Sequence, residues 1–213
     1  MIHRKASDIF DGFLRRPGYR RYLWGRLLRA CGYDEEHWVR VVYAREWRDH
    51  FASLPLQSLS VLEISPGPRP LIERGSVACY RAVNFPEFDI TRDTLSEKFD
   101  LIIAEQVFEH LRHPHRAARN IHSMLKDDGL FMIATPFMIK IHGHPKDYTR
   151  WTPDGLGAFL EDCGFLAEVH SWGNKKAVCG NLDKWREYGW RRDIRNEPDL
   201  PAAVWAYARK ASC

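Results

Sequence analysis

Residues 135–153, TPFMIKIHGHPKDYTRWTP, are rich in side chains that can hold a polar molecule and move a proton. Histidine suits proton removal near neutral pH, because its ordinary pKa is about 6.5. We nominate His144 as the general base and His110 as the second choice, with Arg150 as an anion holder. An alternative is that this segment only locks itself against the next helix. The candidates for substrate contact are Glu109, His142, Asp147, Tyr148, Arg150 and Trp151.

The same histidines raise the question of a metal site. His110 is followed closely by His113 and His115, and His142 by His144 and Asp147. Neither set has the spacing of a closed zinc site, and a single H-x-H pair recurs often by chance. We therefore expect no bound metal.

A second group of chemically useful residues lies in the segment VLEISPGP, residues 61–68. It places Glu63 near the end of an expected strand, with a turn directly after it. A dinucleotide site requires G-x-G-x-x-G, so that a pyrophosphate can approach the backbone, but Gly67 is the only glycine here. The segment therefore disfavours a dinucleotide. It favours a ligand with an amino acid and a nucleoside, whose ammonium group Glu63 can orient.

The elements that would position these residues follow from apolar runs that alternate with helical stretches, a pattern typical of parallel strands buried on both faces. Helices are expected near 114–126 and 152–163, the second with Pro153 at its first position and Gly164 at its end. Open α/β sheets bind ligands at the carboxyl ends of their strands. The expected strands are 60–64, 77–84, 100–104, 129–135, 166–172 and 202–210.

With these features together, residues 60 to about 170 resemble a class I S-adenosylmethionine (SAM)-dependent methyltransferase of the small-molecule type. The resemblance implies a Rossmann-like α/β fold, with a mostly parallel sheet, an antiparallel closing strand and helices on both faces. It implies SAM as cofactor and S-adenosylhomocysteine as product. It places Glu63, Ser65 and Gly67 at the methionine end of the cofactor, Asn84 at the ribose, and Asp89 and Ile90 at the adenine.

The segment FDLIIAEQVFEHLRHP, residues 99–114, resembles the family's fourth strand and the loop that follows it. By this resemblance, Glu105 and Gln106 lie beside the sulfonium, and Glu109 and His110 at the mouth of the acceptor site. Enzymes that methylate base amines carry a different element here, Asn or Asp followed by Pro-Pro and an aromatic residue. Methylation of a nucleobase amine is therefore not expected.

Two positions depart from the family pattern. Ser65 stands where the family usually has a glycine, and Asn84 where it usually has Asp or Glu. An amide can still bond to a diol, but it lacks the charge that strengthens such a bond by roughly 1 kcal/mol. We expect weaker cofactor binding, and a catalytically degenerate binding protein is a further alternative.

Composition indicates one domain in the 213 residues, with 45% hydrophobic and 28% charged residues. We divide it into a helical N-terminal cap (1–55), a SAM-binding core (56–170), and an insertion with a closing strand (171–213). The five scattered cysteines indicate reduced thiols, and no membrane span or secretory signal is apparent, so a cytoplasmic location is expected. The oligomeric state is left open, with a homodimer as one option.

The predicted function is methyl transfer to an oxygen, or a nitrogen, of a polar small molecule such as a sugar or natural-product intermediate. The alternative is an RNA methyltransferase, suggested by the basic helical cap and the basic, aromatic stretch 184–195. We expect that stretch instead to be an amphipathic helix that packs Trp185, Tyr188 and Trp190 inward. Nucleic acid is therefore not the expected partner.

Overall fold

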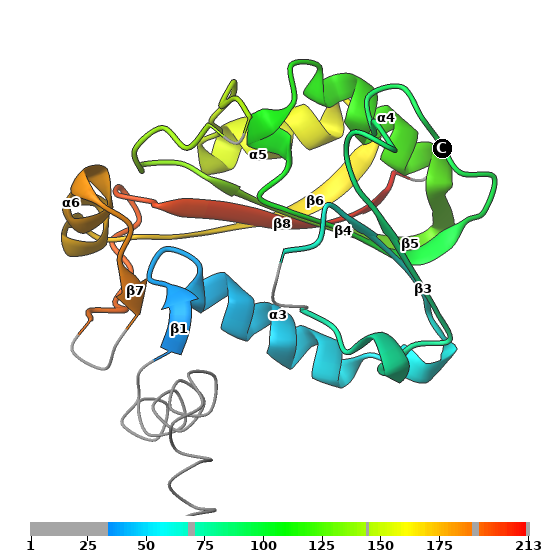
Figure 1. The fold of residues 1–213 in the computed structure, drawn as a ribbon, viewed down its shortest axis with the longest axis horizontal. Coiled ribbons are helices and arrows are strands. Elements are labelled where there is room, and N and C mark those ends of the chain that lie inside the picture. Colours follow the sequence, from blue (N-terminus) through cyan, green and yellow to red (C-terminus); the bar gives the residue numbers. More distant parts are fainter. Residues whose placement is uncertain (1–33, 68–70, 144, 189–191, 212–213) are drawn as a thin grey trace, which may run out of the picture.

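The computed structural model describes residues 34–67, 71–143, 145–188 and 192–211, and it is built around one six-stranded sheet (Figure 1). The order of the strands is β3-β2-β4-β5-β8-β6. Strands β3, β2, β4 and β5 run parallel, while β8 is antiparallel to both β5 and β6. The strands are β2 (Ser60–Ile64), β3 (Cys79–Val83), β4 (Phe99–Glu105), β5 (Leu125–Pro136), β6 (Phe165–Trp172) and β8 (Ala203–Lys210).

The central strands are buried on both faces, which explains their continuous apolar sequence. In β4, residues 101–104 are at most 1% exposed, and Val61 and Leu62 of β2 are fully buried. The expected fold class is confirmed: this is a Rossmann-like α/β sheet that is mostly parallel and has an antiparallel closing strand.

Helices cover both faces of the sheet (Figure 1). Helices α4 (Pro114–Met124) and α5 (Pro153–Glu161) lie on one face, and α3 (Val41–Ser53) lies on the other. Helix α5 begins as its sequence predicts, because Thr152 Oγ1 accepts a bond of 3.0 Å from Gly155 N. Gly164 follows it with φ of 87°, a conformation that favours glycine.

Helix α3 is held to the sheet by aromatic packing and by one acidic side chain. Tyr43 and Trp47 are fully buried and pack beside Trp205 of β8. Glu46 accepts bonds from Trp205 Nε1 at 2.8 Å and from the Tyr207 hydroxyl at 2.9 Å. These contacts fix the N-terminal end of α3 near the carboxyl edge of the sheet.

The helical cap predicted for 1–55 holds only in part. Residues 1–33 lie outside the described residues, and the part that follows opens with a strand, β1 (Asp34–His37), before α3. Strand β1 pairs antiparallel with β7 (Glu187–Tyr188). A short strand with charged residues carries no periodic signal, which is why the sequence did not reveal it.

The helix predicted over 184–195 is wrong. In its described part the segment holds β7, with Tyr188 buried and Trp185 38% exposed, while Trp190 lies outside the described residues. The helix of this insertion comes earlier, as α6 (Lys175–Asp183). Short helical turns complete the described chain: η1 (Leu56–Ser58), η2 (Arg74–Ser76) and η3 (Phe108–His110). None of the helices in the described part is long and apolar enough to cross a membrane.

Candidate active site

The carboxyl ends of β2, β3 and β4 open onto a cavity of about 530 Å³. Because these strands are parallel, the segments that follow them meet at one edge of the sheet. Four of the predicted cofactor residues line the cavity: Ser65, Asp89, Ile90 and Gln106. Its volume lies in the range of roughly 300–1,000 Å³ that is typical of small-molecule sites.

Two residues in left-handed backbone conformation lie at this cavity. Ser65, directly after β2, has φ of 50°, and Gln106, directly after β4, has φ of 54°. Each is held by a backbone bond of 2.8 Å, from Ser65 N to Val83 O and from Gln106 N to Ala134 O. Non-glycine residues in this conformation cost about 1–3 kcal/mol and gather at functional sites. The backbone therefore bends sharply at Ser65, after β2, and at Gln106, after β4.

Asp89 supplies a negative charge at the cavity wall. Its carboxylate accepts bonds from Thr91 N (3.0 Å) and Thr91 Oγ1 (2.7 Å) and pairs with Arg92 at 3.0 Å. Burial alone would raise the pKa of Asp89, but these bonds and the Arg92 charge outweigh it and lower the pKa. The carboxylate is thus ionised near neutral pH and can accept bonds from an amino or hydroxyl group.

Phe85 and Phe88 also line this cavity, and sequence reasoning did not select them. Phe85 is 64% exposed, although large apolar side chains are mostly buried in folded proteins. The signal that could have found them is the FPEF segment directly after an expected strand. Their rings offer flat apolar surface that suits a nucleobase.

Glu63 is not among the described residues that line the cavity. Its side chain is buried, with 2% exposure, and it accepts a bond from the hydroxyl of Tyr80 in the neighbouring strand. Burial raises the pKa of Glu63, and the Tyr80 bond only partly opposes this. Burial of Tyr80 and its bond to Glu63 raise the pKa of Tyr80 to about 12.

Three other predicted cofactor residues likewise lie outside the cavity lining. Gly67 is exposed, and a Cβ added there would meet nothing within 4 Å. Asn84 is exposed after β3, and its carbonyl accepts a bond from Phe88 N at 2.9 Å. Glu105 instead faces α3: its Oε1 accepts a bond from the Tyr43 hydroxyl at 2.8 Å and lies 3.4 Å from Arg40.

A second cavity of about 200 Å³ adjoins the same edge, and Gln106 lines both cavities. Arg40 and Trp185, which sequence reasoning missed, line it together with His142. Arg40 follows β1 and Trp185 precedes β7, so the β1–β7 pairing brings these two distant segments of the chain together. The Trp185 ring meets the His142 ring edge-on, with centroids 5.5 Å apart.

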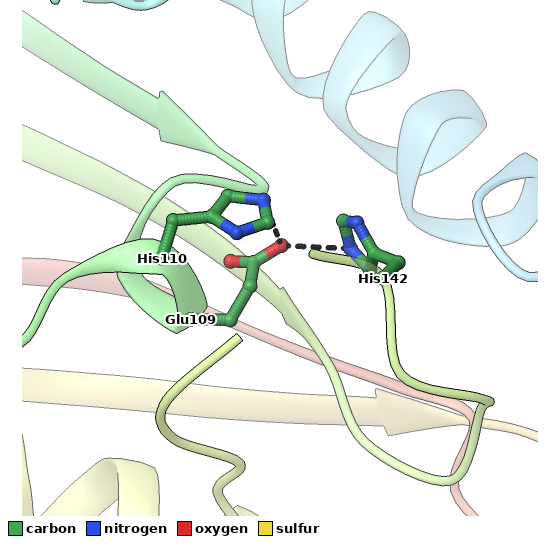
Figure 2. Close-up of side chains that lie close together, drawn as sticks. All are labelled: Glu109, His110 and His142. Atoms are coloured by element: carbon green, nitrogen blue, oxygen red, sulfur yellow. Dashed lines mark ion pairs between the residues drawn. The ribbon is translucent and has the colours of Figure 1, made fainter. Parts of the chain in front are cut away.

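Glu109, His110 and His142 form a compact cluster, which we call the Glu-His-His cluster (Figure 2). Turn η3 carries Glu109 and His110, and His142 comes from the loop after β5. Glu109 Oε1 lies 3.2 Å from His142 Nε2 and 3.6 Å from His110 Nε2. Glu109 is fully buried, yet neither of its carboxylate oxygens has a hydrogen-bond donor among the described residues.

The remaining predicted substrate residues hold the loop after β5 in shape. Arg150 bonds Asp147 Oδ1 at 2.9 Å and the Phe137 carbonyl at 2.8 Å, and Asp147 Oδ2 accepts from His142 N at 3.0 Å. Trp151 is buried against Phe159. Tyr148 is exposed and lines the larger cavity, while His144 lies outside the described residues.

A family model described as a methyltransferase domain matches residues 25–161 of the chain. Among curated proteins, a ubiquinone biosynthesis O-methyltransferase from Glaesserella parasuis serovar 5 (strain SH0165) is 37% identical over 60 residues. That match covers 27% of this chain and about a quarter, 25%, of the relative.

Solved methyltransferase structures share the fold at low sequence identity. A 1,6-didemethyltoxoflavin-N1-methyltransferase from Burkholderia thailandensis, solved with 1,6-didemethyltoxoflavin and S-adenosylhomocysteine, matches at a TM-score of 0.51 and 15% identity, covering 100% of this chain and 93% of that one. A DhpI complex with S-adenosylhomocysteine matches at 0.53 and 10% identity, covering 82% and 87%. A SAM-dependent methyltransferase from Mesorhizobium loti matches at 0.51 and 12%, covering 81% and 98%.

The family model spans well over half of the chain, and the strand order with its antiparallel closing strand agrees with the shared fold. The predicted family is thereby confirmed. The chain belongs to the methyltransferase domain family.

Proposed function

We propose that the enzyme transfers the methyl group of SAM to an oxygen of a polar small molecule, with nitrogen as the alternative acceptor. The observation that carries this proposal is the pair of cavities at the carboxyl edge, which share Gln106. The larger cavity suits the cofactor. The smaller one, of about 200 Å³, suits a compact acceptor better than a nucleic acid strand.

In this proposal, the nucleoside of SAM occupies the larger cavity. Asp89 accepts bonds from its polar groups, while Ile90 and Phe85 contact the base. Ser65 and Gln106 lie at the bends after β2 and β4, where the sulfonium end would approach the acceptor. Direct contact of Glu63, Gly67, Asn84 and Glu105 with the cofactor stays a prediction from sequence.

The acceptor would enter the smaller cavity, between Arg40, His142 and Trp185. Its oxygen lone pair forms the new O–CH₃ bond while the S–CH₃ bond breaks, and the sulfur keeps the bonding pair to become a neutral thioether. The enzyme's main task is to align the acceptor and remove its proton. His144 remains our proposed base, and His110 the second choice.

The proposal is tested by measuring S-adenosylhomocysteine release from a panel of polar hydroxyl and amine compounds. With an accepted compound, His144→Ala should lower kcat roughly 100-fold, because a positioned general base contributes about that much or more. His122→Ala is the matched control, since His122 lies at the far end of α4 from the carboxyl edge. Normal turnover in His144→Ala would remove this histidine from the chemistry, and no product with any compound would contradict the enzymatic role.

A further inference from the structure

The buried carboxylate of Glu109 lacks a compensating partner. Its side chain has 0% exposure, and no donor among the described residues bonds to either oxygen. A buried carboxylate without hydrogen bonds costs several kcal/mol, so such groups pair with a cation or bind a metal. A positive charge at this point would compensate the buried carboxylate.

The hydrogen bonding of His110 shows which of its nitrogens is free. Nδ1 lies 2.6 Å from the carbonyl oxygen of Lys146, and a carbonyl can only accept, so Nδ1 carries the proton. In the neutral ring, Nε2 then presents a lone pair, and it faces Glu109 Oε1 at 3.6 Å. A lone pair opposite a carboxylate is repulsive unless a cation lies between them.

His142 brings a second ring nitrogen to the same carboxylate. Its Nε2 lies 3.2 Å from Glu109 Oε1 but, among the described residues, has no hydrogen-bond partner. The three ligand atoms all lie within 4.8 Å of one another (Figure 2). Two ligands bound at about 2.1 Å to one ion are separated by roughly 3.0–3.5 Å at octahedral or tetrahedral angles.

From this geometry we propose that the Glu-His-His cluster binds one divalent first-row transition-metal ion, with Zn²⁺ as the reference ion. Two imidazoles and one carboxylate form the ligand set of catalytic zinc sites that keep a coordination position open. The linear spacing of the histidines concealed this site, because Glu109 and His142 are joined only by the fold.

The surrounding contacts are those that orient metal ligands. His110 donates Nδ1–H to a backbone carbonyl, which fixes the ring and its tautomer. Asp147 holds the backbone of His142, and Arg150 holds Asp147. Tyr148 N donates to the Glu109 carbonyl at 2.7 Å. The two segments that carry the ligands are thus tied together independently of an ion.

The position of the cluster suggests what the ion does. His110 lines the larger cavity and His142 the smaller one, so an ion between them lies at the junction of the two. An open coordination position can hold an acceptor oxygen and favour its deprotonation. This role, unlike metal binding itself, rests on the proposed function.

The test is calorimetric titration of Zn²⁺ into chelator-treated full-length protein, with Co²⁺ absorption spectra as a second readout. We expect one ion per chain, and binding weakened about 100-fold or more in Glu109→Gln and in His142→Ala. His170→Ala is the matched control, because His170 also pairs with a glutamate, Glu168, at 3.1 Å, but from β6. Thermal unfolding shows whether each variant is folded.

Equal Zn²⁺ binding by the wild type and by the folded Glu109→Gln and His142→Ala proteins would overturn the site and assign the uptake to other ligands, such as the exposed Cys79 and Cys179. Absence of uptake by the wild type would also overturn it. Titration of S-adenosylhomocysteine into the same samples reports on the cofactor site separately. If the wild type binds S-adenosylhomocysteine but no Zn²⁺, the metal site is contradicted and the proposed function is not.

Discussion

Ser65 occupies a backbone conformation that suits glycine. Its φ of 50° is unfavourable for a residue with a Cβ, by about 1–2 kcal/mol. We predict that Ser65→Gly raises the free energy of unfolding by about 0.5–1 kcal/mol, the remainder being lost to the greater freedom of glycine in the unfolded chain. Urea denaturation measures this. Ser76→Gly, outside the left-handed region, should destabilise instead, and equal losses in both variants would contradict the argument.

Glu63 makes the stability of the fold depend on pH. Because its pKa is raised by burial, the folded state binds the proton more tightly than the unfolded chain does. Its contribution is therefore most favourable below the unfolded pKa of about 4.5, and it is lost as the pH rises through the raised folded value.

We predict that Glu63→Gln removes this loss, since the amide carries no charge but can still accept the Tyr80 bond. Unfolding free energies measured from pH 4 to pH 8 should fall less steeply with pH in the variant than in the wild type. Parallel curves would contradict the assignment. Titration of S-adenosylhomocysteine into the same variant tests whether Glu63 also contributes to cofactor binding.

At the scale of elements, the loop after β5 depends on the pair of Asp147 and Arg150. Burial alone would raise the pKa of Asp147, but the bonds from Arg150 and from the His142 N–H outweigh burial, and the net effect is a lowered pKa. The stabilisation is thus present above the ordinary pKa of the carboxyl and is lost as the pH falls through the lowered value. At neutral pH the pair is fully formed.

We predict that Arg150→Met frees the loop, because it leaves Asp147 buried without its guanidinium, at a cost of about 1–3 kcal/mol. Hydrogen exchange at pH 7 should show lost protection in residues 137–152 while β4 and β5 stay protected. Arg195→Met, which breaks the exposed pair with Asp193, is the control and should leave this loop unchanged. Unchanged protection in Arg150→Met would show that Arg150 does not hold the loop.

The buried strands were predictable as elements. The strand at 60–64 was predicted with its observed bounds, because burial on both faces demands a continuous apolar run between polar turns. Thr152 and Pro153 likewise predicted the start of helix α5, and Gly164 predicted its end. By contrast, β1 and β7 stabilise each other through pairing between distant segments, which no local pattern records.

At the scale of the whole molecule, the sequence indicated the edge of the sheet at which the larger cavity lies better than the individual side chains that line this cavity. Ser65, Asp89, Ile90 and Gln106 do line the larger cavity, since the direction of parallel strands puts their carboxyl ends together. The side chain of Glu63 is instead buried against the neighbouring strand, where it accepts a bond from Tyr80. Arg40, Trp185 and the Glu-His-His cluster required long-range contacts, which linear spacing does not contain.

In our proposal the methyl group passes from the larger cavity past Gln106 to the smaller one. The measurement that tests this most directly is a crystal structure of the protein saturated with S-adenosylhomocysteine. We predict that its adenosine lies against Asp89 and Ile90, with its sulfur beside Gln106. A ligand bound elsewhere, or an empty carboxyl edge at saturation, would contradict the account.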